Sequence, residues 1–204
     1  MNDPARLYAP AAARNREPIF QVLKRHLPQR GLVLEIASGS GEHIVHFAQN
    51  SAPDLIFQPS DPDATVRANI DAWSAELGLT NVRPALALDA QSSDWPLSQA
   101  DAVLCINMIH IAPWTAAIGL MRGAAQLLGS GGMLYLYGPF RRNGRHTAPS
   151  NEQFDQSLRD RNSAWGVRDA EEVAALAAMH GFAPPLIEDM PANNLSLIFR
   201  RQSD

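Results

Sequence analysis

The chain has a single cysteine, an excess of acidic over basic residues, and no long hydrophobic run. Cys105 is the only cysteine among the 204 residues, so no internal disulfide can form. A lone thiol inside the apolar run AVLCINM is typical of a reducing compartment and is poorly placed to act as a nucleophile. We therefore expect a cytoplasmic protein whose chemistry does not use cysteine.

The missing positive charge and the missing apolar runs exclude further classes of protein. The formal charge is −4 at pH 7, whereas proteins that coat nucleic acids or anionic membranes present a basic surface. No stretch approaches the ~18 unbroken apolar residues of a membrane span, and MNDPARLYAP lacks the apolar core of a signal peptide. We expect a soluble protein with neither a nucleic-acid partner nor a membrane partner.

What the sequence does contain is an alternation of strand-like and helix-like segments. Helical periodicity recurs between the first six of seven short apolar runs, and this predicts a doubly wound α/β sheet with helices on both faces. The turn MPANN is too short for a crossover helix, so the last strand should be antiparallel. The expected strands are 32–37, 55–58, 85–88, 102–106, 133–137, 185–188 and 195–199, and the expected helices are 42–49, 64–77, 114–128 and 170–180.

The length of the chain predicts a single domain over residues 1–204. Two segments fall outside the alternation. Residues 1–30 form an N-terminal cover segment, in which the pair Glu17-Pro18 predicts a helix with proline in its first turn. Residues 138–168 form a lid-like insertion that follows the fifth strand and should emerge above the ligand-binding edge of the sheet.

Polar residues follow the strands at the edge where open α/β sheets bind ligands. Strand one carries Glu35 and continues into the turn ASGSG, in which Gly39 and Gly41 let a ligand approach the backbone and leave helix N–H groups free. Asp61 follows strand two, where a carboxylate can accept hydrogen bonds from both hydroxyls of a ribose. Asp89 follows strand three and can meet an adenine edge. Together these residues predict an adenosine pocket, although Asp61 and Asp89 also suit turns or loop caps.

Two cofactors share such a pocket. The dinucleotide fingerprint G-x-G-x-x-G needs a third glycine where this sequence has Ile44. S-adenosylmethionine instead brings a cationic sulfonium and an α-amino group, which a carboxylate can partner. Glu35 supplies that carboxylate, and a charged group inside VLEIA would be costly to bury without a partner. The residues favour S-adenosylmethionine over a nicotinamide dinucleotide.

These acidic residues and glycines resemble the class I methyltransferases, whose usual loop is [DE]-x-G-x-G-x-G. Ala37 replaces the first glycine and would lie near the methionine tail. Longer stretches are similar to the methyltransferase-like family labelled domain of unknown function 938. The resemblance implies a Rossmann-like class I sheet with strand order 3-2-1-4-5-7-6 and an S-adenosylmethionine site, but no particular acceptor. It is carried, across residues 10–195, by PAAARNREPI, VLEIASGSGEHIVHFA, INMIHIAPW, YGPF, SNEQFD, WGVRD and MPANNL.

Candidate catalytic residues follow strands four and five. His110, in INMIHIAPW, lies just past strand four, where an imidazole can accept a proton from the methyl acceptor; the alternative is a histidine that packs or caps the next helix. Tyr137 ends strand five and is a second candidate for handling that proton. Asn107 is expected to contact the cofactor. No metal site is expected, because the two histidines in GEHIVHFA lack a third ligand and suit helix-end and packing contacts.

Five further residues are candidates for acceptor binding. Arg168 ends the arginine-rich insertion of an otherwise acidic chain, which predicts a clamp for an anionic group. Arg14 and Asn15, in AARNREP, can close the pocket from the N-terminal side, with surface polarity as the alternative. Asn193 and Asn194 turn at the cofactor face and can reach the substrate, with a pure turn role as the alternative.

The sequence thus predicts a methyltransferase that uses S-adenosylmethionine to modify a small, anionic metabolite. Methyl transfer mostly requires that donor and acceptor be aligned and water excluded. A protein acceptor remains open, and no oligomeric state is predicted. Two alternatives are an NAD(P)-dependent oxidoreductase and a non-catalytic module that binds S-adenosylmethionine or a partner on the same fold.

Overall fold

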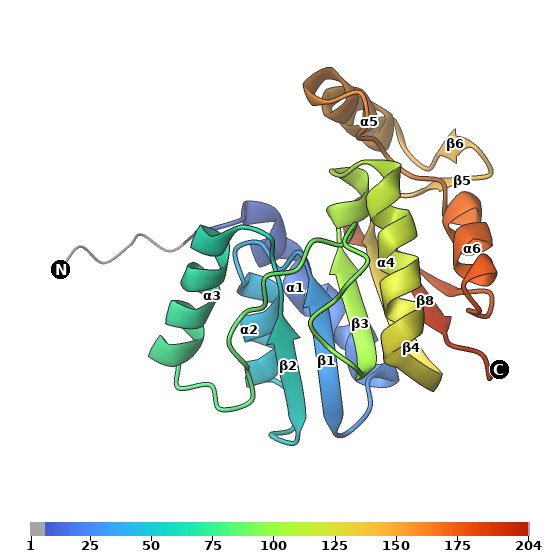
Figure 1. Ribbon diagram of the computed structural model, residues 1–204. Coiled ribbons are helices and arrows are strands. Elements are labelled where there is room, and N and C mark those ends of the chain that lie inside the picture. The colour runs from blue at the N-terminus through green and yellow to red at the C-terminus, as the bar shows by residue number, and fades with distance from the viewer. Residues whose placement is uncertain (1–6, 204) are drawn as a thin grey trace.

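A computed structural model describes residues 7–203, which contain a main sheet of six strands in the order β2-β1-β3-β4-β8-β7 (Figure 1). β2, β1, β3 and β4 are parallel neighbours, and β8 runs antiparallel to both β4 and β7. The predicted α/β class and the antiparallel last strand are confirmed. The strands are β1 (Gly31–Ile36), β2 (Leu55–Pro59), β3 (Ala100–Ile106), β4 (Leu128–Gly138), β7 (Leu186–Met190) and β8 (Asn194–Arg200).

The expected strand at 85–88 does not form, so the prediction of seven strands is wrong. The chain meets β2 there only through isolated parallel bridges, Phe57 with Val82 and Ser60 with Leu86. Proline has no N–H to donate to a ladder, and Pro84 interrupts this segment. The segment nevertheless lies beside β2, where the implied strand order places its third strand.

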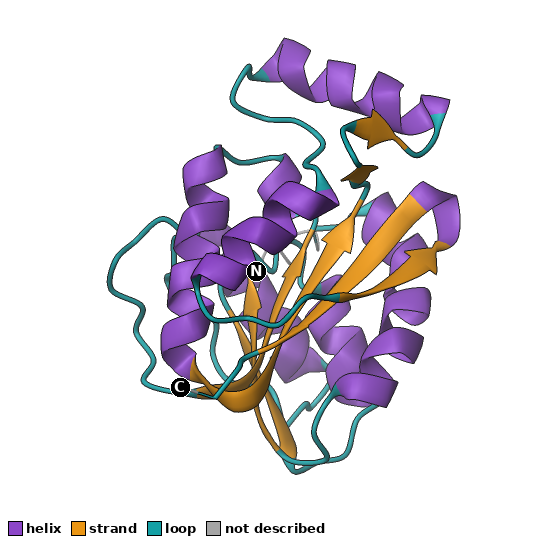
Figure 2. Cartoon of the chain, turned by 90° about the vertical axis from the view of Figure 1, so that its right-hand side faces the viewer, coloured by secondary structure: helices purple, strands orange, loops and turns teal. Residues whose placement is uncertain are grey.

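Helices cover both faces of the sheet (Figures 1 and 2). Because side chains alternate along a strand, Val33 of β1 packs with one set of helices and Leu34 with the other. The first face carries α1 (Pro10–His26), α2 (Glu42–Gln49) and α3 (Ala64–Glu76), and the second carries α4 (Trp114–Leu127) and α6 (Ala170–Met179). No helix within residues 7–203 is long and apolar enough to cross a membrane.

The N-terminal helix α1 starts earlier than its sequence indicates. It begins at Pro10, and Pro18, expected in the first turn, lies inside it. Proline is tolerated at the first helical position because that N–H has no intrahelical partner, whereas inside the helix it removes one backbone bond. The other end of α1 is fixed to the far edge of the sheet, where Arg25 and His26 contact Glu188 of β7.

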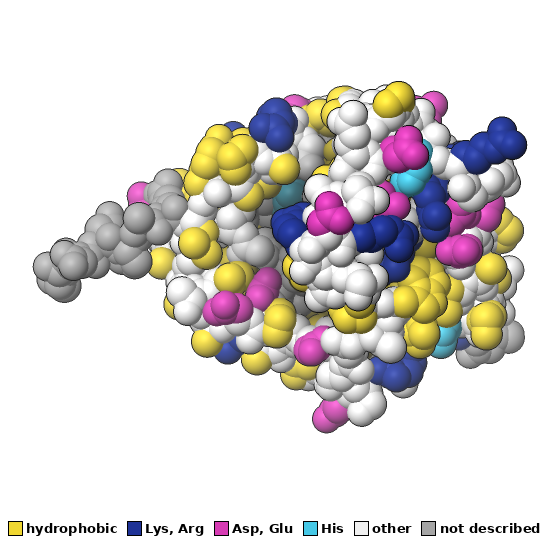
Figure 3. Space-filling view, turned by 90° about the horizontal axis from the view of Figure 1, so that it is seen from above, with side chains coloured by type: hydrophobic (Ala, Val, Ile, Leu, Met, Phe, Trp, Pro, Cys, Tyr) yellow, Lys and Arg dark blue, Asp and Glu magenta, His cyan; other side chains and the backbone are white. Residues whose placement is uncertain are grey.

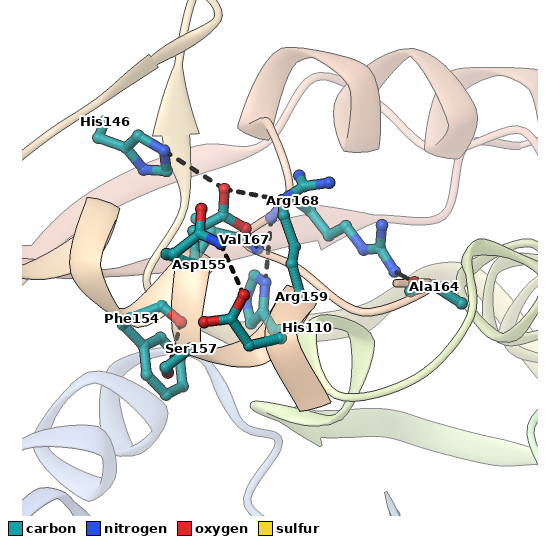
Figure 4. A network of polar contacts seen from close by, with 11 residues as sticks. His110, His146, Phe154, Asp155, Ser157, Arg159, Ala164, Val167 and Arg168 are labelled. Carbon is teal, nitrogen blue, oxygen red and sulfur yellow. Dashed lines mark hydrogen bonds and ion pairs between the residues drawn. The ribbon is translucent and has the colours of Figure 1, made fainter. Parts of the chain in front are cut away.

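The segment after β4 stands above the carboxyl ends of the strands (Figures 1 and 2). Asp155 holds it together by accepting hydrogen bonds from Val167 N at 2.7 Å and Arg159 Nε at 3.1 Å, while His146 Nε2 lies 3.5 Å away (Figure 4). One buried carboxylate thus connects the helix, the hairpin and the chain leading to α6. These elements are β5 (Arg141–Arg142), β6 (Arg145–His146) and α5 (Pro149–Arg161).

Candidate functional site

The turn after β1 is built from residues with positive φ. Ala37, Gly39 and Gly41 have φ of 55°, 54° and 81°, and alanine in this left-handed region is strained where glycine is not. A Cβ added at Gly41 would lie 2.9 Å from Ile70 Cγ1, whereas one at Gly39 would meet no atom within 4 Å. The turn is therefore closed on the side of α3 and open at Gly39, where a ligand is expected.

Glu35 is a buried acid with a free oxygen. It is 1% exposed, and among the described residues its Oε2 has no hydrogen-bond partner. Burial raises the pKa of its carboxyl group to about 8, although a hydrogen bond with Ser38 lowers it, and the charge of Asp61 raises it further. A cation or a hydrogen-bond donor placed beside this oxygen would remove the cost of burying it.

Asp61 and Asp89 have different surroundings. Asp61 is 8% exposed, and its two carboxylate oxygens accept hydrogen bonds from Gly39 N at 3.2 Å and Asp63 N at 3.0 Å. Each oxygen keeps a second lone pair for a ligand hydroxyl. Asp89 is exposed, and its Oδ1 accepts a hydrogen bond from Gln91 N at 2.9 Å. The geometry suits ribose binding by Asp61 and favours the loop-cap alternative for Asp89.

His110 is a buried imidazole whose ring contacts the Arg168 backbone (Figure 4). It is 1% exposed and packs edge-on against Phe140 with ring centroids 4.8 Å apart. Its Nδ1 accepts a hydrogen bond from Arg168 N at 3.2 Å, so the proton resides on Nε2. Burial lowers the pKa of His110 to about 3. The basic nitrogen is occupied, and this favours the packing alternative over proton acceptance.

Tyr137 and Asn107 lie side by side at the ends of β4 and β3. Burial raises the pKa of Tyr137, and a hydrogen bond with Asn15 offsets part of that rise, so its phenol stays protonated at neutral pH. Asn107 N donates to Tyr137 O at 2.8 Å, and Asn107 O accepts from His110 N at 3.1 Å. With φ of 63°, Asn107 adopts a conformation that asparagine tolerates better than most residues. Its backbone thus aligns the strand ends below the expected cofactor.

Arg168 uses its guanidinium inside the protein. Its Nε donates to Ile109 O at 2.9 Å, and its Nη2 donates to Ala112 O at 2.6 Å and to Ala164 O at 2.9 Å. The same group lies over the ring of Trp114 at 5.6 Å from the ring centroid. These contacts hold the insertion against the residues that follow β3. They favour a structural role over the predicted anion clamp.

The two asparagines of the turn MPANN make different contacts. Asn194 Nδ2 donates to Pro191 O at 3.0 Å, as a turn residue does, whereas Asn193 O accepts from Asn151 Nδ2 of α5 at 2.8 Å. The residues 191–193 form the short 3-10 helix η2 (Pro191–Asn193). A cavity of about 230 Å³ lies beside them, lined by Thr147, Asp189, Met190, Asn193, Asn194 and Leu195.

The N-terminal candidates lie on α1. Arg14 is exposed. Asn15 Oδ1 is 2.8 Å from His43 Nε2 of α2, and the Asn15 side chain also contacts Tyr137. The sequence interpretation of His43 as a packing residue missed this link, because only the tertiary structure brings α1 beside α2 and β4. It also missed Glu42, which is 1% exposed and accepts a hydrogen bond from Ala9 N at 3.0 Å.

The face above the strand ends is hollowed left of its centre, and basic side chains border the hollow (Figure 3). Within the part of the chain that the structure describes, no three His, Cys, Asp or Glu residues form a group that could hold a metal ion. The polar groups at this edge are carboxylates, which accept hydrogen bonds, and side-chain amides and backbone N–H groups, which can donate them. Such a set suits an organic ligand with hydroxyl and amino groups.

Solved methyltransferase structures share this fold, among them the following three. An O-methyltransferase family protein from Burkholderia thailandensis is 20% identical, covers 95% of this chain and 58% of its own, and has a TM-score of 0.79. Human N-acetylserotonin methyltransferase, in complex with S-adenosylmethionine, is 14% identical and has a TM-score of 0.74; the alignment covers 95% of this chain and 53% of that protein. The methyltransferase CalO1 of calicheamicin biosynthesis, with S-adenosylhomocysteine bound, is 16% identical and has a TM-score of 0.74; the alignment covers 94% of this chain and 54% of that protein.

The chain therefore spans 53% to 58% of the length of these proteins, and the likeness, at such low identity, is one of fold. A family model described as "Protein of unknown function (DUF938)" matches residues 6–201. That match covers nearly the whole chain and confirms the resemblance carried by the sequence stretches. The chain belongs to the DUF938 family and has the class I methyltransferase-like fold.

Proposed function

We propose that the protein is a methyltransferase that binds S-adenosylmethionine at the carboxyl ends of β1 and β2. One observation carries the proposal: the Glu35 carboxyl group is buried with Oε2 unpartnered among the described residues, beside a turn that is open at Gly39. A carboxyl group in this position gains most from a ligand that carries an ammonium group. Two of the structures with this fold hold S-adenosylmethionine or S-adenosylhomocysteine.

Each residue has a defined task at such a site. Asp61 accepts hydrogen bonds from the ribose hydroxyls through its remaining lone pairs, and Glu35 faces the α-amino group. The N–H groups at the start of α2, after Gly41, are donors that the N-cap leaves without a side-chain acceptor. S-adenosylmethionine, when bound, supplies an activated methyl group. The protein then needs to align the acceptor and exclude water, a task we assign to the cover segment 1–30 and the insertion 138–168.

The protonation of His110 and Tyr137 narrows the class of acceptor. His110 presents N–H rather than a free lone pair, and the pKa of Tyr137 is raised by burial. We infer that neither residue removes the proton of the acceptor. The acceptor then arrives with its nucleophilic atom unprotonated, as a phenolate, a thiolate, a carboxylate or an amine. This class includes the small anionic metabolite that the sequence predicts.

Calorimetry with the purified protein tests the proposal. We expect S-adenosylhomocysteine to bind and NAD⁺ and NADP⁺ not to bind. Glu35→Gln should weaken S-adenosylhomocysteine roughly tenfold or more, since a hydrogen bond to a charged group contributes about 1.5–3 kcal/mol. The matched control Glu152→Gln changes an exposed acid of α5 and should leave the affinity unchanged. Dinucleotide binding in place of S-adenosylhomocysteine would contradict the proposal and support the oxidoreductase alternative.

Methyl transfer itself needs a second assay. A panel of phenols, thiols, carboxylic acids and amines is incubated with methyl-labelled S-adenosylmethionine and the protein. For an accepted compound, kcat/KM should rise with pH through the pKa of that compound, because no group of the protein takes up the proton. Binding without transfer to any compound of the panel would favour a non-catalytic module. A value of kcat/KM that does not change with pH around the pKa of the acceptor would contradict the inference that the acceptor binds unprotonated.

A further inference from the structure

Helix α1 turns one arginine toward the interior of the molecule. Residues three, four or seven positions apart share a face of a helix. Arg16 therefore shares the buried face of α1 with residues that are 0% to 5% exposed, namely Ala12, Ile19, Phe20 and Leu23. Arg16 itself is partly buried. It belongs to the half of α1 that reaches the ligand-binding edge, whereas the other half ends at β7.

Arg16 has no acidic partner among the described residues, unlike three other arginines of the chain. Arg25 pairs with Glu188, and Arg142 pairs with Glu171. Arg16 lies close enough to His43 for its charge to act on that imidazole: the pKa of His43 is lowered to about 4 by burial, by His46 and by the positive charge of Arg16. An arginine that is partly buried without an anion is costly, so an anionic ligand is expected.

The position of α1 indicates which part of the ligand this arginine meets. Asn15 connects α1 to His43 at the start of α2 and contacts Tyr137 at the end of β4. Asp61 lies on the other side of the glycine turn, at the end of β2, with Glu35 of β1 between the two. A nucleoside whose ribose lies on Asp61 therefore extends across β1 toward β3 and β4. Its far end lies at the N-terminal half of α1.

We propose that Arg16 binds the α-carboxylate of the cofactor's methionyl group while Glu35 faces its α-ammonium group. This inference rests on the proposed function and assigns the amino-acid end of the same ligand. A zwitterion is recognised best by two groups of opposite charge, and a guanidinium can hold a carboxylate with two parallel hydrogen bonds. The hydrogen bonds from His43 to Asn15 and from Ala9 to Glu42 fix α1 against α2. They position Arg16 without touching the ligand.

Two ligands test the role of Arg16 separately from the binding of the adenosine. S-adenosylhomocysteine has the complete amino-acid end, whereas 5′-methylthioadenosine keeps the adenosine and the thioether but lacks that end. Calorimetry should show Arg16→Gln binding S-adenosylhomocysteine roughly ten- to hundredfold more weakly than the unaltered protein, the range expected for a lost charged hydrogen bond. The affinity for 5′-methylthioadenosine should stay the same. Arg16→Lys keeps the charge but not the paired donors, and should fall between the two.

The control is Lys24→Gln, which removes one positive charge from the exposed side of the same helix and should change neither affinity. Thermal unfolding of Arg16→Gln should occur at or above the temperature of the unaltered protein, because the substitution removes an unpaired charge. An unchanged affinity for S-adenosylhomocysteine would overturn the inference. So would equal weakening of both ligands together with a lower unfolding temperature, which a purely structural arginine would cause. If the unaltered protein binds neither ligand, the proposed function itself is wrong.

Discussion

The polar groups in the two halves of the ligand-binding edge differ in whether other residues of the protein satisfy them. At the ends of β1 and β2, Glu35 has an unpartnered oxygen among the described residues and Gly39 borders open space. At the ends of β3 and β4, Arg168 donates to three backbone carbonyls and His110 accepts a hydrogen bond from Arg168 N. This difference supports our proposal that the first half binds the ligand. The second half is arranged to hold the insertion above it.

The largest expected effect concerns the ligand half and its pH dependence. The pKa of Glu35 is about 8 in the folded protein against an ordinary value of 4.5, so the folded state holds a proton that the unfolded state has lost. The free energy of unfolding should therefore fall, by several kcal/mol, as the pH rises from about 4.5 to about 8. Urea unfolding across this range should show that fall, and Glu35→Gln should flatten it. An equal slope in both proteins would contradict the raised pKa.

The protonation of Glu35 should also change when a ligand binds, and this tests whether the first half holds the ligand. An ammonium group beside Glu35 favours the carboxylate, so binding of S-adenosylhomocysteine at pH 7 should release a proton. Calorimetry in two buffers of different ionisation enthalpy measures that proton. Glu35→Gln should release none, and Glu152→Gln should behave as the unaltered protein. Identical binding enthalpies in both buffers would contradict the assignment of Glu35.

The next largest effect belongs to the insertion. Asp155→Ala removes the acceptor of the Val167 N–H and the partner of Arg159, and should lower the free energy of unfolding by about 2–3 kcal/mol. Affinity for S-adenosylhomocysteine should change little, because the site lies in the other half. Asp155→Asn keeps an oxygen for Val167 N and should lose less. A large loss of cofactor affinity in Asp155→Ala would break the separation between the two halves.

A smaller effect is expected where the insertion leaves the sheet. A Cβ at Gly138 would collide with the His110 ring, so Gly138→Ala should lower the free energy of unfolding by about 1–2 kcal/mol through overpacking. Gly129→Ala is the matched control, because a Cβ there meets no atom within 4 Å. Urea unfolding measures both. Equal stability of the two variants would show that His110 is free to move.

The smallest effect concerns Ala37. Alanine at φ of 55° is strained by about 1–2 kcal/mol, and glycine at the same place loses about 0.5–1 kcal/mol of chain entropy. Ala37→Gly should therefore stabilise the protein by at most about 1.5 kcal/mol. Ala48→Gly, in the last turn of α2, should instead destabilise it by about 1 kcal/mol. Thermal unfolding separates the two, and a destabilised Ala37→Gly would show that the turn carries no strain.

Much of the candidate site could be predicted from its position along the chain. Glu35 lies near the end of β1, and Gly39 and Asp61 follow β1 and β2. The carboxyl ends of parallel strands meet at one edge whatever the details of packing. The partners of Arg168 and of Asn15 could not be predicted. Those side chains contact residues far away in the sequence, and no local pattern states which backbone carbonyl or ring a long polar side chain will reach.

The sequence alone determined the alternation of strands and helices, the antiparallel last strand and the acidic residue before the glycine turn, because periodicity and turn length are local properties. Only the tertiary structure decided that the segment 85–88 pairs too sparsely to form a strand and that α1 begins at Pro10. It also decided that Arg16 faces the interior without an acidic partner among residues 7–203. The reason is that pairing and burial depend on which distant surfaces meet, and this is settled by packing of the whole chain.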